Sequence, residues 1–219
     1  SLGGSVIVHD EDSYEYLVKF RGLIINHSKK EKIVIVCGGG HTARIYIKPL
    51  QKANVNVKLQ GLIGIRVTRL NAWLLIDLFK GKSAPVVGKS LNHVKELLKR
   101  HKIVISGGLS YDPKSSSDAS AVQIANMLNA DFINITNVKG VYDKHPKLKG
   151  AKFIQCMTFN QLYKMTSAIG FKPGQHGILD VHAASLIKKH NIETYIVGSD
   201  LGNLKKILNG KKFVGTIIS

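Results

Sequence analysis

The chain has 219 residues, of which 44% are hydrophobic, so it can bury a substantial core and is predicted to form one domain over residues 1–219. Its formal net charge of +18 favours phosphate-bearing ligands, whereas an aromatic content of only 7% argues against nucleic-acid binding. Two cysteines are too few for a disulfide framework, and no run is apolar over a membrane-spanning length, which predicts a cytoplasmic protein with no membrane partner.

Short apolar runs alternate with helical periodicity along the chain. Ser1 and Leu2 have the pattern of the end of a strand whose beginning lies outside the given sequence. Further strands are predicted at 32–37, 84–87, 103–106, 132–135, 194–197 and 216–218, and helices at 12–25, 63–79, 91–100, 118–128, 179–190 and 201–208. Pro49 is expected to end or kink the helix after the triple glycine. Strand runs without polar alternation are typical of a parallel sheet that helices cover on both faces, with ligands at the carboxyl ends of its strands.

Two glycine clusters stand where a strand gives way to a helix. The first is Gly3 and Gly4 with Ser5, and the second is Gly38–Gly40. Backbone N–H groups and the helix dipole at such a junction can face an anion. Arg44 follows the second cluster by one helical turn, which puts a guanidinium within reach of a bound oxyanion. One cluster alone is often only a tight turn, but two in one chain favour phosphate binding.

A third candidate anion site lies in the segment 107–118, which follows one strand and opens a helix. Ser116 and Ser117 can hold a phosphoryl oxygen at the helix N-terminus. Asp118 can orient a lysine or a metal, or it can serve only as an N-cap, and the residues leave both interpretations open.

A fourth polar loop leaves the strand at 132–135. Thr136 and Asn137 can read a base or ribose edge, and Tyr142 can cover a base. Lys139 or Lys144 can meet nucleotide phosphates. The alternative is an ordinary polar surface turn. A dedicated metal site is not predicted, because the one candidate group would be spread around a helix. That group is His176, Asp180 and His182.

Taken in chain order, these motifs resemble the amino-acid-kinase superfamily, and within it they are most like those of archaeal UMP kinases. The motifs are Gly-Gly-Ser, Gly-Gly-Gly-x-x-Ala-Arg, the segment 63–72, Gly-Gly through Ser-Asp-Ala, and Thr-Asn-Val-x-Gly-Val-Tyr. The resemblance covers essentially the whole chain. It implies an α/β fold, a three-layer αβα sandwich with a mainly parallel central sheet, and self-association, often as a hexamer. It also implies Mg²⁺-dependent transfer of the ATP γ-phosphoryl group to UMP in pyrimidine nucleotide synthesis.

The same resemblance assigns roles to individual positions. The ATP-binding positions are Gly4, Ser5, Gly40, Arg44, Thr136, Asn137 and Tyr142. The acceptor-binding positions are Gly39, Ser116 and Ser117. Asp118 matches the family aspartate that organises phosphoryl transfer, a reaction that needs positioning and positive charge more than a protein nucleophile.

The chain also departs from the family pattern. Gly61 stands where family members hold the acceptor ribose with an aspartate, so Gly61→Asp is expected to tighten UMP binding. Lys139 and His145 replace acidic residues near ATP, and Ser1 replaces a basic residue found in many members. Two alternatives therefore stand beside the nucleoside monophosphate kinase: a non-catalytic nucleotide or oxyanion binder similar to molybdenum storage proteins, and a kinase for another small phosphate or carboxylate.

Overall fold

The structure is a computed structural model that describes residues 1–8, 13–111, 116–169 and 179–219. A central sheet runs in the order β2, β1, β3, β7, β8, β6, with Leu2 bridging β1 to β3 in parallel through Cys37 and Ile135. Its strands are β1 Ile33–Val36, β2 Ile103–Ser106, β3 Phe132–Thr136, β6 Cys156–Met157, β7 Thr194–Gly198 and β8 Thr216–Ile218. A separate antiparallel pair joins β4 Val141–Tyr142 to β5 Phe153–Ile154.

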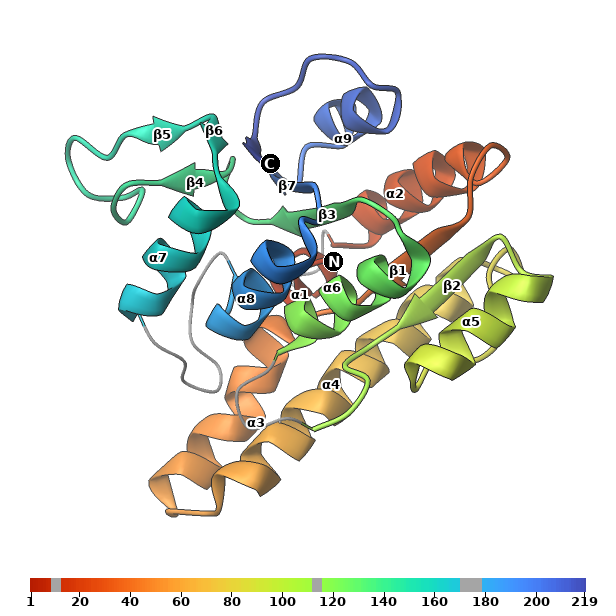
Figure 1. Cartoon of the computed structure of the whole chain (residues 1–219). Helices are drawn as coiled ribbons and strands as arrows, with labels where there is room; N and C mark the ends of the chain where they lie inside the picture. Colours follow the sequence, from red (N-terminus) through yellow and green to blue (C-terminus); the bar gives the residue numbers. More distant parts are fainter. Residues whose placement is uncertain (9–12, 112–115, 170–178) are drawn as a thin grey trace.

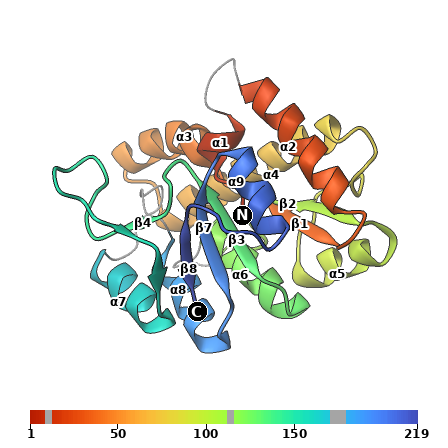
Figure 2. The same cartoon turned by 90° about the horizontal axis from the view of Figure 1, so that it is seen from above.

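Helices cover both faces of this sheet (Figures 1 and 2). They are α1 Gly4–Ile7, α2 Ser13–His27, α3 Gly40–Lys52, α4 Val57–Leu78, α5 Leu91–Arg100, α6 Ser117–Leu128, α7 Phe159–Ile169, α8 Val181–His190 and α9 Leu201–Leu208. Figure 2 shows α6, α7 and α8 on one side of the strands and α1, α2 and α9 on the other.

Alternate strand residues enter two separate cores. Val36 and Val104 pack with the apolar residues of α5, α6, α7 and α8. Ile35 and Ile105 point to the other face and pack with α1, α2, α4 and α9. The pairs β1–β2, β3–β7 and β6–β8 are parallel, and β7–β8 is antiparallel. The predicted three-layer αβα sandwich with a mainly parallel sheet is confirmed.

The strand predicted at 84–87 is wrong, because this segment pairs with β2 only at its two ends. Ala84 N donates to Ile103 O at 2.8 Å, and Gly88 N donates to Ile105 O at 3.0 Å. These two donors are four residues apart, whereas their acceptors on β2 are only two residues apart, so the segment between them is out of register with β2 and forms no continuous ladder of hydrogen bonds.

Three other sequence-based expectations also need correction. α3 does not end at Pro49 but continues to Lys52. The carbonyl that Pro49 leaves without an N–H donor belongs to Ile45, which is solvent-exposed, so water can satisfy it. α4 begins at Val57 instead of residue 63, and α7 and the strands β4, β5 and β6 were not predicted. The three strands are two residues each, too short to show a periodic pattern.

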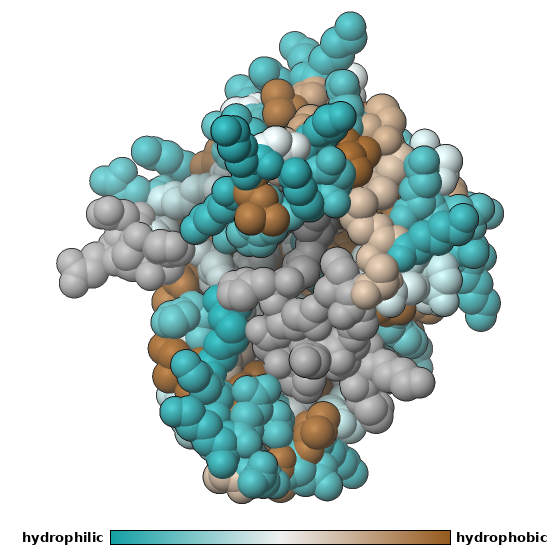
Figure 3. Space-filling view, turned by 90° about the vertical axis from the view of Figure 1, so that its left-hand side faces the viewer, coloured by the Kyte–Doolittle hydropathy of each residue, from teal (hydrophilic) through white to brown (hydrophobic). Residues whose placement is uncertain are grey.

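Among the residues coloured in Figure 3, most on this face are hydrophilic, with apolar residues in smaller groups between them. This agrees with a composition that contains 32 Lys and Arg residues. Of the helices in the described part of the chain, none is long and apolar enough to cross a membrane.

Candidate active site

The two glycine clusters pack directly against each other at the carboxyl end of the sheet. A Cβ atom on Gly4 would lie 2.2 Å from the Gly40 nitrogen, and one on Gly40 would lie 2.3 Å from the Gly4 carbonyl carbon. Leu2 holds the arrangement in the sheet, because it accepts a 2.9 Å hydrogen bond from Gly38 N. The clusters therefore form one structure, in which glycine permits backbone to approach backbone.

The start of α3 lies at this junction. Its cap residue, Gly39, makes no side-chain hydrogen bond, so no cap side chain satisfies the first N–H groups of a 13-residue helix. Arg44 follows in the next turn and is partly buried, and this burial lowers the pKa of its guanidinium. No ion pair to Arg44 is found within the described residues. The start of α3 therefore combines N–H donors that no cap side chain engages with a nearby cation.

Asp118 lies at the start of α6, close to the first glycine cluster. The Ser1 hydroxyl donates to Asp118 Oδ1 at 2.9 Å, and Ser1 is two residues before Gly3. The N-cap of α6 is Ser116, whose Oγ accepts from Asp118 N at 3.0 Å. Asp118 is thus not the helix cap, and its carboxylate is available for another role.

Burial raises the pKa of Asp118 to about 6, and the negative charge of Asp180 contributes to the shift. Asp180 caps α8 by accepting from Ala183 N at 2.8 Å, and its other carboxylate oxygen accepts from Ser116 Oγ at 2.5 Å. One aspartate therefore connects the starts of α6 and α8. From the sequence alone, Asp180 could be predicted as a helix cap, because an Asp directly before an apolar helix is typical of an N-cap. Its contact with Ser116 could not be predicted.

Side chains of α4 fasten both loops of the site. Asn71 Nδ2 donates to Gly38 O at 2.7 Å, and Thr68 Oγ1 accepts from Gly108 N at 2.8 Å. The Arg69 guanidinium donates to Gly108 O at 3.1 Å and to Leu109 O at 2.5 Å. The motif at 63–72, to which the sequence assigned no residue roles, therefore positions the second and third glycine segments.

The predicted site residues in the loop after β3 lie in two different places. Thr136 ends β3 beside Gly3, whose nitrogen donates to Ile135 O at 2.9 Å. The Thr136 hydroxyl donates to Asn137 Oδ1 at 3.3 Å. Tyr142 lies instead on the β4–β5 hairpin, where its ring meets Phe153 edge to face at 5.5 Å between centroids. The structure thus places Thr136 and Asn137 at the glycine junction and Tyr142 on a neighbouring hairpin.

Comparisons with known proteins agree with this geometry. The family model "Amino acid kinase family" matches residues 1–198.

The chain belongs to the amino acid kinase family.

Among family relatives, the uridylate kinase of Thermoplasma volcanium is 34% identical over 220 residues, covering 100% of this chain and 95% of that protein. The uridylate kinase of Thermococcus onnurineus is 36% identical, covering 99% of this chain and 96% of that protein. The crystal structure of uridylate kinase from Archaeoglobus fulgidus superposes with a TM-score of 0.86 at 33% identity, covering 100% of this chain and 98% of that one. The UMP kinase of Ureaplasma parvum, at 23% identity and a TM-score of 0.78, shares the fold. The resemblance inferred from the motifs is confirmed.

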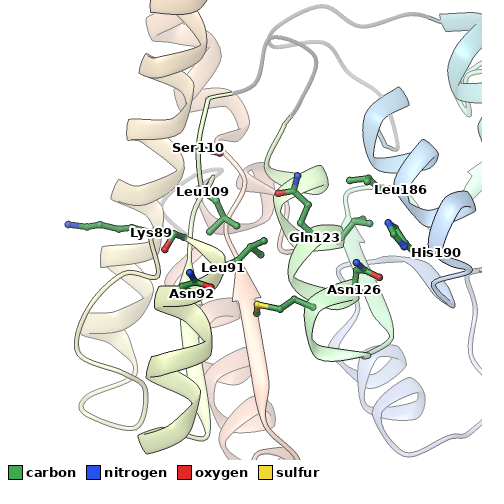
Figure 4. A pocket seen from close by; sticks show the side chains of 12 residues that line it. Lys89, Leu91, Asn92, Leu109, Ser110, Gln123, Asn126, Leu186 and His190 are labelled. Atoms are coloured by element: carbon green, nitrogen blue, oxygen red, sulfur yellow. The ribbon is translucent and has the colours of Figure 1, made fainter.

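The structure also has a cavity that lies away from the glycine junction. It is a cavity of about 570 Å³ between α5, α6, α8 and the loop after β2 (Figure 4). Figure 4 shows Gln123 of α6 and His190 of α8 on one side and Leu91 of α5 on the other, while the side chain of Lys89 extends away from them. None of the site residues predicted from the sequence lines this cavity.

The structure also shows where the residues that depart from the family pattern lie. Lys139 and His145 are exposed. Gly61 faces the ring of Tyr111, so a Cβ atom there would lie 2.4 Å from Tyr111 Cε2. A side chain at position 61 would therefore displace that ring, and Gly61→Asp alone is no longer expected to tighten UMP binding.

Proposed function

We propose that this family member is an ATP-dependent UMP kinase that converts ATP and UMP into ADP and UDP. The observation that carries the proposal is the junction of Gly4 with Gly38–Gly40 next to Asp118, in a chain similar over its full length to archaeal uridylate kinases. Both nucleotides are metabolites of the cytoplasm, where we place the activity.

In this proposal the start of α3 holds phosphate. The backbone N–H groups at the start of α3, which follow Gly39, face the phosphoryl group that is being transferred. Arg44 neutralises part of the charge of that group. Ser5 and Thr136 contact ATP from the adjoining segments, with Asn137 and Tyr142 further along its pocket. The residues bring two substrates into line, which is the main contribution a protein makes to phosphoryl transfer.

The start of α6 serves the acceptor. Ser117 offers its hydroxyl to the UMP phosphate, while Ser116 caps the helix and ties it to Asp180. The Asp118 carboxylate orients the groups around the transferred phosphoryl. Because Ser1 replaces a basic residue here, Arg44 and the α3 amides supply the positive charge from the protein.

Mg²⁺ belongs to this proposal as the partner of ATP. Asp118 and Asp180 offer carboxylate oxygens, the ligand type that Mg²⁺ prefers, and the effect of Asp180 on the pKa of Asp118 indicates that a cation would be favourable there. These residues fit the ion. When bound, Mg²⁺ neutralises charge on the phosphates.

ADP release from Mg-ATP tests the proposed function. We expect turnover with UMP at about 1–100 s⁻¹ and little with CMP, AMP, GMP or no acceptor. Molybdate and tungstate binding is measured on the same sample. Absence of turnover with every nucleotide, together with tight oxyanion binding, would instead identify a non-catalytic binder.

We also propose that the chain associates with copies of itself through the α3–α4 face. Leu70, Trp73 and Leu74 occupy successive turns on one side of α4, and their exposed fractions are 60%, 43% and 40%. Ile63 and Val67 on the same side of α4 pack against α3. Apolar side chains gathered on one helix face in this way are typical of an interface between subunits.

Leu70→Lys is expected to shift the protein to a smaller assembly, because it places a charge in an apolar contact. Sedimentation equilibrium measures the mass. Leu148→Lys is the matched control, since Leu148 is 57% exposed in a loop outside this face. Equal masses for both variants and the wild type would exclude the α3–α4 face as the interface.

A further inference from the structure

The ring of Tyr111 lies directly on α4 at Gly61. A Cβ atom on Gly61 would come within 2.4 Å of Tyr111 Cε2 and 2.8 Å of Tyr111 Cδ2, closer than side-chain atoms approach. A glycine inside a helix costs about 1 kcal/mol relative to alanine. Glycine at position 61 therefore lowers the stability of α4 slightly, but it allows the aromatic ring to pack against the helix backbone.

Other helical glycines of the chain show that this contact is specific. A Cβ atom on Gly22 of α2 would meet nothing within 4 Å. One on Gly64, a turn further along α4, would meet only Ile47 Cδ1, at an ordinary 3.5 Å. Position 61 is thus the point on α4 at which a side chain and Tyr111 exclude each other.

The loop that carries Tyr111 is held in register along α4. Gly107 packs on Thr68, and Gly108 packs on Ile65, where a Cβ atom would lie 3.3 Å from Cγ1. Arg69 holds the carbonyl oxygens of Gly108 and Leu109. These contacts precede Tyr111 by only a few residues, so the backbone that carries Tyr111 is held close to α4.

The same stretch of α4 borders the start of α3. A Cβ atom on Gly39 would lie 3.6 Å from Thr68 Cγ2 and 3.8 Å from Gly64 O. Gly61 is three residues from Gly64, about 4.5 Å along the helix axis. In a nucleoside monophosphate the sugar is one ester linkage from the phosphate. With the acceptor phosphate near Gly39, the sugar therefore lies within reach of Tyr111.

We infer that Tyr111 forms the contact with the sugar of the acceptor, in place of a side chain at position 61. The inference rests on the proposed UMP kinase function. Tyr111 is half-buried, and its hydroxyl makes no hydrogen bond within the described residues. A phenol meets the sugar with one neutral hydroxyl, whereas a carboxylate accepts from two neighbouring hydroxyls at once. Ribose and 2′-deoxyribose acceptors are therefore treated alike.

Steady-state kinetics with UMP and dUMP test this inference. We expect the wild-type kcat/KM values to agree within about tenfold, far below the 10⁴-fold or more achieved by a site built around a substrate hydroxyl. Tyr111→Ala raises the KM for both acceptors by about tenfold, or 1.4 kcal/mol, and leaves the KM for ATP unchanged. Tyr111→Phe raises it less, because the ring remains.

A double-mutant cycle links the effect to the contact. Gly61→Ala lowers acceptor kcat/KM by about tenfold or more, whereas Gly61→Ala combined with Tyr111→Ala is no worse than Tyr111→Ala alone, because the clash is gone. Gly22→Ala is the matched control, a helical glycine with open space that leaves both acceptors unaffected. Thermal unfolding of each variant separates loss of fold from loss of acceptor binding.

Three outcomes overturn the inference. An unchanged acceptor KM in folded Tyr111→Ala would make the tyrosine merely structural. A wild-type preference of 10⁴-fold for UMP over dUMP would exclude a single phenol as the sugar contact. If the wild type released no ADP with any acceptor in the assay described above, the proposed function would be wrong, and this inference with it.

Discussion

Asp118→Asn is expected to lower kcat for UMP phosphorylation by about 10²-fold or more while leaving the fold intact. The carboxylate is held at the start of α6 by Ser1 and lies near Asp180, with its backbone nitrogen bound to Ser116. Asparagine has the same shape and can still accept the Ser1 hydroxyl bond, so the change removes charge and little else. Rapid-quench or coupled assays of ADP formation measure the effect.

The pH dependence of the reaction gives a second measure of the same residue. Burial and Asp180 raise the pKa of Asp118 to about 6, so in the free enzyme the carboxylate is lost below that pH and kcat/KM falls there. A raised folded-state pKa also means that the unfolding free energy falls as pH rises from the unfolded pKa of about 4 toward 6. At pH 8, Asp118→Asn therefore unfolds at a temperature no lower than the wild type.

Asp131→Asn is the matched control. Asp131 also has a raised pKa, mainly through burial, but it precedes the first residue of β3, at the opposite end of the strand from Thr136. Its replacement should leave kcat and the acid limb of the pH profile unchanged. If Asp118→Asn retained both as well, the aspartate would have only a structural role.

Much of the fold could be predicted because it is recorded in local patterns. The run at 103–106 is a buried strand of the sheet, and the periodic segment at 91–100 is α5. The segment at 84–87 carries the same apolar signal but meets β2 only through Ala84 and Gly88, because four residues there stand opposite two residues of β2. Apolar content predicts burial, whereas pairing also depends on a register that a single sequence does not show.

The candidate site likewise contains residues that local sequence patterns reveal and contacts that they do not. The glycine clusters and Ser116 could be found because each lies at a junction of strand and helix that the sequence marks. The contact of Asp180 with Ser116 and that of Gly61 with Tyr111 join residues far apart in the chain. Such contacts depend on which strands pair, so no spacing rule in a single sequence reveals them.

Gly40→Ala is expected to damage both stability and activity. Gly40 has φ of +58°, a conformation that costs an alanine about 1–2 kcal/mol. Its new methyl group would also lie 2.3 Å from the Gly4 carbonyl carbon and 2.4 Å from the Ser5 nitrogen, both of them backbone atoms at the start of α1. We expect a fall in melting temperature of about 5 °C or more and a raised KM for ATP, measured by calorimetry and steady-state kinetics.

Gly210→Ala separates the two causes. Gly210 has φ of +64°, but a Cβ atom there meets nothing within 4 Å, so this variant reports the backbone strain alone. The additional loss in Gly40→Ala is then the cost of forcing the glycine clusters apart. Equal melting temperatures for the two variants would mean that the clusters do not pack against each other, and the phosphate site would lose the contact that aligns the start of α3 with Gly4 and Ser5.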